Sequence, residues 1–150
     1  MTTRDDRSEI VDLLARYTNL LDRGGHQAWV ELFTEDARFL VYGRSFDGRE
    51  GLLEMAAAAP AGLHLAGAPV VEVDGDRATV QQSFLFVDQV TRSQQIGWYD
   101  DVLVRDGGRW RFRSRRSTFL GPNGPSDRPA VATDAPPAAA DGGSGAGTTR

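Results

Sequence analysis

The sequence predicts an α+β protein with three N-terminal helices packed on one face of a curved, mainly antiparallel sheet. Apolar residues in the first half recur every three or four positions, as on amphipathic helices. The second half holds strand-like runs separated by the turn signals Asp74-Gly75-Asp76 and Asp106-Gly107-Gly108. Helices followed by hairpin-linked strands are typical of the α+β class, and helices laid across a bent sheet enclose a cone that can hold a ligand.

The first helix has the clearest pattern. Thr3 or Asp6 can cap its start, and Gly24 and Gly25 end it, so the helix stops close to Asp22. Its apolar positions have the spacing of a single buried stripe: Ile10, Leu13, Leu14, Tyr17, Leu20 and Leu21.

Two shorter helices and one strand complete the first half. A second helix is expected over residues 26–33, with His26 capping or flanking its start. The chain then turns into a strand over residues 37–42. A third helix is expected over residues 48–58, because Pro60 prevents its continuation.

Four strands are expected in the second half, over residues 64–73, 77–90, 95–105 and 109–120. The last of them alternates strictly between apolar and basic side chains, which places its arginines on one face. We expect that face to be solvated or to contact a second subunit. The arginines are Arg111, Arg113 and Arg115, and the opposite face carries Trp110, Phe112 and Ser114.

The domain prediction separates a folded unit, residues 5–120, from a tail, residues 121–150. A chain of 150 residues is large enough for one domain with a single core. The tail consists mainly of Gly, Pro, Ala, Ser, Thr and Asp. Such a segment buries too little apolar surface to offset its ordering entropy, so we expect it to be disordered.

The composition excludes several kinds of chemistry. The chain has no cysteine, and all 17 of its basic residues are arginine. Disulfides, thiolate nucleophiles, Cys-bound metals and lysine Schiff bases are therefore excluded. The histidines and carboxylates lack the compact spacing of a metal motif, so no metal and no cofactor is expected.

Charge and hydropathy disfavour nucleic acid and membranes as partners. A net charge of −4 disfavours nucleic acid and anionic membranes. No apolar run is long enough to span a bilayer, and the polar N-terminus lacks the apolar core of a secretory signal. The expected location is the cytoplasm.

His64 and Asp88 are the first candidates for chemistry. Imidazole changes charge near neutral pH and suits general acid–base work, although a histidine at a strand start can also be purely structural. Asp88 shares a strand face with Phe84 and Phe86 by period-2 alternation. If that face points inward, His64 is the obvious partner for the carboxylate; if the strand ends earlier, Asp88 lies in solvent.

Tyr17 and Asp22 are the candidates on the first helix. Tyr17 lies on the apolar stripe, so it is either a pocket group or a core residue with a bonded hydroxyl. Asp22 falls about 140° from the centre of that stripe on an ideal helix. It either lies where the helix unwinds before Gly24 or merely terminates the helix.

Six segments of the sequence, taken in their order along the chain, resemble the SnoaL-like branch of the nuclear transport factor 2-like superfamily, over residues 5–120. That branch includes scytalone dehydratase, bile acid 7α-dehydratases and the small subunits of ring-hydroxylating dioxygenases. One cone hosts several reactions and also non-catalytic subunits. The segments that carry the resemblance are Tyr17 to Asp22, Trp29 to Ala37, His64, Val73 to Ala78, Gly97 to Asp101 and Gly108 to Phe112.

The resemblance implies a cofactor-independent lyase or isomerase, foremost a dehydratase, that acts on a small cyclic or polycyclic substrate of phenolic, polyketide or steroid-like kind. It implies that His64 removes a proton next to a carbonyl with help from Asp88, which is matched by spacing alone. Tyr17 and Asp22 would hold the departing hydroxyl. It also implies a homodimer through the exposed sheet face. The expected substrate-binding residues are Trp29, Phe33, Phe84, Phe86 and Asp101.

Two other functions fit the same fold. The first is a non-catalytic binding or assembly subunit, which needs only the cone and the sheet surface. The second is a polyketide cyclase or an epoxide hydrolase, in which Asp101 or Asp88 replaces His64 as the key group.

Overall fold

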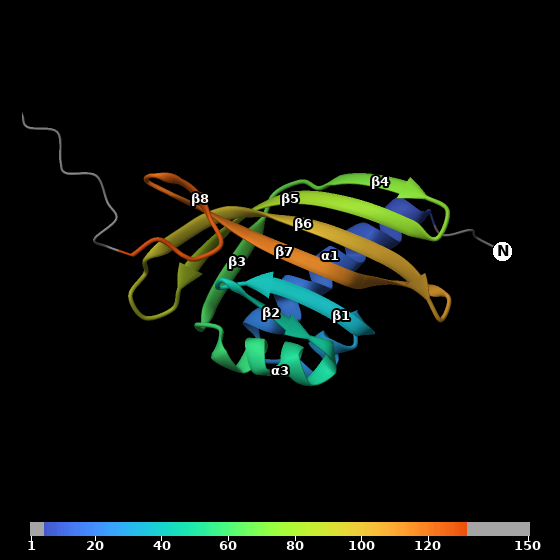
Figure 1. Ribbon diagram of the computed structural model, residues 1–150, viewed down its shortest axis with the longest axis horizontal. Coiled ribbons are helices and arrows are strands. Elements are labelled where there is room, and N and C mark those ends of the chain that lie inside the picture. Colours follow the sequence, from blue (N-terminus) through green and yellow to red (C-terminus); the bar gives the residue numbers. More distant parts are fainter. Residues whose placement is uncertain (1–4, 132–150) are drawn as a thin grey trace, which may run out of the picture.

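The computed structural model describes residues 5–131 of the chain. It has three helices, α1 (Asp6–Asp22), α2 (His26–Val30) and α3 (Gly48–Ala58), within these residues. Figure 1 shows them against the strands. In chain order the strands are β1 (Phe33–Val41), β2 (Arg44–Asp47), β3 (Gly62–Ala66), β4 (Val70–Asp74), β5 (Arg77–Asp88), β6 (Gln94–Asp106), β7 (Arg109–Gly121) and β8 (Gly124–Ser126).

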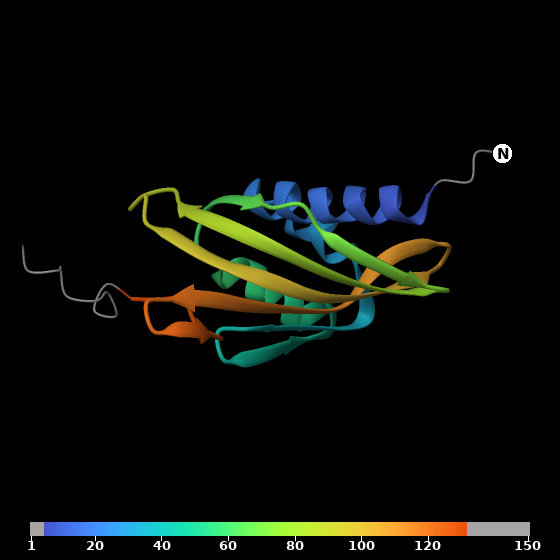
Figure 2. The ribbon, with the colours of Figure 1, turned by 90° about the horizontal axis from the view of Figure 1, so that it is seen from above.

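All strands belong to one mixed sheet in the order β2-β1-β7-β6-β5-β3, with β4 paired to β5 and β8 paired to β7. The pairing of β1 with β7 is parallel, and the other pairings are antiparallel. Figure 2 shows α1 lying across one face of the sheet, and α3 packs against β1 and β2. The predicted α+β class, with helices on a curved and mainly antiparallel sheet, is confirmed.

Helix α1 follows the predicted apolar stripe. Ile10, Leu13, Leu14 and Tyr17 are buried against the sheet. Asp5, rather than Asp6, is the N-cap, and Thr3 lies outside the described residues. Gly24 ends the helix region in the left-handed conformation, with a φ of 76°, which glycine adopts without steric cost.

The segment after α1 differs from its prediction. Helix α2 stops at Val30, because Phe33 already pairs in parallel with Phe112 of β7. Strand β1 therefore starts earlier than residue 37, and it ends at Val41. Strand β2 was not expected and forms a hairpin with β1. Helix α3 has the predicted bounds.

The strand expected over residues 64–73 is two strands, β3 and β4, which pair with different halves of β5. Pro69 lies in the break between them and has no N–H for a sheet hydrogen bond. Gly67 still donates its N–H to the Ser83 carbonyl at 2.8 Å, so the chain remains close to β5 where it crosses between the two strands.

The strict alternation predicted for β7 is interrupted by a β-bulge. Val102 pairs with Ser114 and Leu103 pairs with Phe112, so Arg113 is an extra residue on β7. An extra residue reverses which later side chains face the core. The expected surface of three arginines is therefore wrong for Arg115, which points inward and is 1% exposed.

The predicted tail is partly ordered. Gly124–Ser126 form β8, which pairs with the end of β7. The Gln95 amide then donates to the Ala130 carbonyl at 3.1 Å. Residues 132–150 of the predicted tail lie outside the described residues. No helix within residues 5–131 is long and apolar enough to cross a membrane.

Candidate active site

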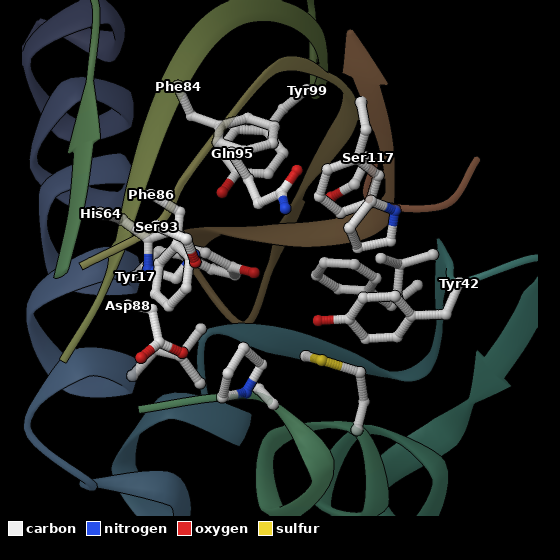
Figure 3. A pocket seen from close by; sticks show the side chains of 18 residues that line it. Tyr17, Tyr42, His64, Phe84, Phe86, Asp88, Ser93, Gln95, Tyr99 and Ser117 are labelled. Atoms are coloured by element: carbon white, nitrogen blue, oxygen red, sulfur yellow. The ribbon is translucent and has the colours of Figure 1, made fainter. Parts of the chain in front are cut away.

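A pocket of about 150 Å³ opens between α1, α3 and the concave face of the sheet. Figure 3 shows His64 and Asp88 on one side of it and Tyr42 on the other. The walls are mainly apolar and aromatic, and a small number of polar groups point between them, which is the usual make-up of a small-molecule site.

The strongest polar feature of the pocket is a bond between His64 and Asp22. The His64 Nδ1 atom lies 2.6 Å from Asp22 Oδ1, and the His64 backbone N–H donates to Asp22 Oδ2 at 2.7 Å. The two side chains are 16% and 7% exposed. The carboxylate accepts at Nδ1, so in the neutral imidazole the proton lies on Nδ1 and Nε2 is the free acceptor.

The local sequence explains why these two residues meet. Asp22 is the last residue of α1, and α1 packs against β3 at this point. His64 is the central residue of β3 and pairs with Phe86 of β5. Gly62 lets β3 approach β5 closely, because a Cβ atom there would lie 2.2 Å from the Val87 carbonyl oxygen. Of the two predictions for Asp22, helix termination is observed, and the side chain still reaches a pocket residue.

Asp88 does not bond to His64. It lines the pocket with Phe84 and Phe86, so the prediction of an inward strand face is confirmed. Its carboxylate, however, accepts the backbone N–H groups of Val90 and Thr91, each at 2.8 Å. These bonds lower the pKa of Asp88 and hold it as the cap of the β5–β6 turn. The expected His64–Asp88 pair is therefore wrong, and Asp22 takes that place.

Tyr17 lines the pocket from α1 and stacks over a buried ion pair. Asp101 accepts two hydrogen bonds from Arg115, at 2.7 and 2.8 Å, and the Arg115 Cζ atom lies 4.1 Å from the Tyr17 ring centre and 3.8 Å from that of Tyr99. Burial opposes the charge of Arg115, but the Asp101 carboxylate outweighs it and raises the pKa of the guanidinium. Burial also raises the pKa of both tyrosine hydroxyls well above the ordinary value. Both are therefore neutral donors at physiological pH.

Three predicted substrate-binding residues lie away from the pocket. Trp29 and Phe33 are buried in the aromatic core beneath Tyr17, with ring centres 5.6 and 6.1 Å from it. Both carboxylate oxygens of Asp101 accept hydrogen bonds from Arg115. Phe84 and Phe86 do line the pocket, and the Phe86 ring lies 4.7 Å from the His64 ring.

Several polar residues that line the pocket were not predicted from the sequence: Tyr42, Ser93, Gln95, Tyr99 and Ser117. Tyr99 had a usable signal, because alternation along β6 places it on the inward face with Leu103. Ser117 had none, since its face depends on the bulge in β7. Among residues 5–131, no three His, Asp or Glu side chains lie close enough together to hold a metal ion.

Comparison with known proteins gives the family. The model of the SnoaL-like domain matches residues 2–116, which is most of the chain. The protein belongs to the SnoaL-like domain family. The family match ends within β7, so β8 and the pocket residue Pro129 lie beyond it. No curated protein shows a significant sequence match.

Solved structures agree with this assignment. A Mycobacterium tuberculosis protein of unknown function is 32% identical, with a TM-score of 0.68 over 74% of this chain and 69% of that one. A nuclear transport factor 2-like protein with a cystatin-like fold from Novosphingobium aromaticivorans is 27% identical, with a TM-score of 0.70 over 77% and 82%. A candidate scytalone dehydratase from the same organism is 21% identical, with a TM-score of 0.66 over 90% and 95%, and shows the fold alone.

Proposed function

We propose that this SnoaL-like protein is a cofactor-independent lyase or isomerase, and specifically a dehydratase, that acts on a small cyclic hydrophobic substrate. The observation that carries the proposal is the His64–Asp22 pair at the edge of an apolar pocket. A histidine oriented by a carboxylate through Nδ1 is well suited to general base catalysis.

The proposed reaction begins at the free Nε2 atom of His64. It takes a proton from a carbon next to a carbonyl, and Asp22 stabilises the imidazolium that results. The electron pair of the broken C–H bond forms a C=C bond, and the neighbouring C–O bond breaks. The imidazolium returns its proton to the departing hydroxyl, so water leaves and the histidine is again neutral.

Asp22 and Asp88 have different parts in this scheme from those first expected, whereas Tyr17 keeps its part. Asp22 is occupied by His64, so the neutral Tyr17 hydroxyl holds the departing oxygen without help from Asp22. Asp88 lies at the pocket wall with its carboxylate bound to the turn, and it shapes the pocket rather than moving a proton. The apolar walls exclude water and strengthen these contacts.

The two alternatives are less well supported. A non-catalytic subunit needs the cone but has no use for a nearly buried carboxylate–imidazole pair, which is costly to desolvate. A cyclase or epoxide hydrolase that uses Asp101 is disfavoured because this carboxylate makes two hydrogen bonds to Arg115.

The test is a His64→Ala variant assayed on cyclic hydroxyketones, with water loss followed by the ultraviolet absorbance of the conjugated product. We expect the turnover rate to fall by about two to four orders of magnitude. Circular dichroism and urea unfolding would show that the fold is kept. Retained turnover in a folded His64→Ala protein would rule out the proposal.

We also propose a homodimer through the outer face of the sheet. Leu65 pairs with Leu85, and Leu85 pairs with Ile96, so an apolar row crosses β3, β5 and β6 on that face. Leu65 and Ile96 are 62% and 47% exposed. Light scattering should give a dimer for the wild type and a monomer for Ile96→Arg; a monomeric wild type would refute this.

A further inference from the structure

The wall of the pocket opposite His64 carries polar groups of its own. Tyr42 comes from the β1–β2 turn and Ser117 from β7, whereas His64 comes from β3 at the other edge of the sheet. Figure 3 shows Tyr42 and Ser117 on the same side of the pocket, with His64 across from them. The pocket therefore has polar groups at both ends, with aromatic side chains and the Gln95 amide between them.

The backbone of Tyr42 is held in a conformation that its side chain disfavours. Tyr42 and Gly43 form the two-residue turn between β1 and β2, with φ angles of 57° and 72°. Turns of this kind favour Asn-Gly or Gly-Gly, because a bulky residue at positive φ is strained. The turn places the Tyr42 ring in the pocket, stacked 6.1 Å from the ring centre of Phe119. Strained backbone of this kind clusters at functional sites.

The hydroxyls at this end are open to a ligand. In the part of the chain that the structure describes, no hydrogen bond joins the hydroxyl of Tyr42 or Ser117 to another residue. Ser117 is 4% exposed, so its hydroxyl is almost removed from solvent. Each hydroxyl can form a hydrogen bond with an oxygen-bearing group of a bound ligand.

The size of the pocket limits what can reach this end. A cavity of about 150 Å³ holds one benzene-sized ring, whereas sites for drug-sized ligands are about 300–1,000 Å³. Phe84 stacks on Tyr99 in the pocket wall, with ring centres 4.6 Å apart, and Pro129 adds a further wall. By comparison with a cavity of this volume that binds benzene, a bicyclic or steroid-like substrate would require the pocket to widen.

We infer that the pocket takes a single-ring substrate with an oxygen substituent directed at the hydroxyls of Tyr42 and Ser117. This inference rests on the proposed acid–base function only for the part that reacts at His64. It narrows the range of substrates considered for the family, since polycyclic rings do not fit between the two polar ends unless the pocket widens.

Binding of three simple probes tests the inference without any need for turnover. The probes are phenol, toluene and 2-naphthol, titrated into the full chain and followed by ligand-observed NMR. We expect Tyr42→Phe and Ser117→Ala each to weaken phenol binding about two- to tenfold, which corresponds to one lost hydrogen bond. Toluene binding should be unchanged, and 2-naphthol should bind no more tightly than phenol despite its larger apolar area.

Each other outcome overturns the inference. Tighter binding of 2-naphthol would show that the pocket accepts two rings. Equal losses for phenol and toluene would show that the variants change the shape of the pocket rather than an oxygen site. Loss of phenol binding in His64→Ala but not in Tyr42→Phe would show that the phenol oxygen binds at the His64 end of the pocket. Thr118→Ala, on the outer face of β7 next to Ser117, is the matched control.

The two proposals can fail separately. Active His64→Ala protein would remove the acid–base function, and the probe results would stand. Failure of the probes to discriminate would remove the single-ring subsite, and the loss of turnover in His64→Ala would stand.

Discussion

One Asp22 oxygen lies 2.6 Å from His64 Nδ1, and the other accepts the His64 backbone N–H at 2.7 Å. The carboxylate thus fixes both the backbone and the ring of the same residue. It joins the end of α1 to an edge strand that is 42 residues further along the chain.

Asp22→Asn should reduce turnover strongly while the pocket remains. The amide cannot stabilise the imidazolium. Its NH2 group can also donate to Nδ1, which favours the tautomer with the proton on Nε2, the wrong one for a base. We expect a loss of about two to four orders of magnitude in kcat with a smaller change in KM. Asp12→Asn, an exposed carboxylate on the same helix, is the control. Equal kcat values for the wild type and Asp22→Asn would show that Asp22 has only a structural role.

Asp101→Asn should destabilise the fold severely. The substitution leaves the Arg115 guanidinium buried without a counter-charge, which costs about 3–5 kcal/mol of unfolding free energy. Urea unfolding measures this. The double variant Asp101→Leu with Arg115→Met should recover much of the loss, because an apolar pair of similar volume avoids desolvation. If the double variant is as unstable as Asp101→Asn, the unpaired charge is not the cause.

Gly97→Ala should disrupt the centre of the sheet. A Cβ atom at this position would lie 1.9 Å from the Thr118 carbonyl oxygen, so β6 and β7 would have to separate. We expect a loss of more than about 2 kcal/mol, or no folded protein, in urea unfolding. Gly121→Ala has room for its Cβ atom, 3.5 Å from that of Ala130, and should be tolerated. Similar stabilities for the two variants would contradict the close approach.

Truncation after residue 121 should weaken ligand binding. It removes β8, Pro129 and the Ala130 carbonyl to which Gln95 donates. Truncation after residue 131 keeps all of these contacts and should bind phenol as the full chain does. The dissociation constants of the two proteins, measured by the same NMR titration, decide the matter. Equal affinities would show that the segment after β7 has no part in the pocket.

The element types were predictable because helix and strand periods differ, and the bounds of α3 follow directly from its sequence. The face of the sheet to which a single side chain points was less predictable. Arg115 was expected on the surface because alternation assumes an unbroken ladder, and nothing in the sequence marks Arg113 as a bulge. Asp88 has the predicted face, but it stands at a strand end where turn N–H groups compete for its carboxylate.

The contact between Asp22 and His64 was unpredictable for a different reason. Its position on the helix wheel argued against the pocket, because the wheel describes contacts with the sheet beneath the helix. The partner comes instead from β3, a strand that α1 meets near its end. Contacts made at a helix terminus depend on tertiary arrangement and cannot be obtained from periodicity.

The strand order β2-β1-β7-β6-β5-β3 has a consequence for how this protein can change. The proposed acid–base residues lie on α1 and one edge strand, and the opposite end of the pocket is built by the β1–β2 turn and β7. The turn joins β1 to β2, at the opposite end of the strand order from β3, so a change of the Tyr42 side chain alone leaves His64 and Asp22 in place. Under the proposed function, ligand choice and acid–base chemistry lie on different parts of this sheet, so the Tyr42 side chain can be redesigned while the His64–Asp22 pair is kept.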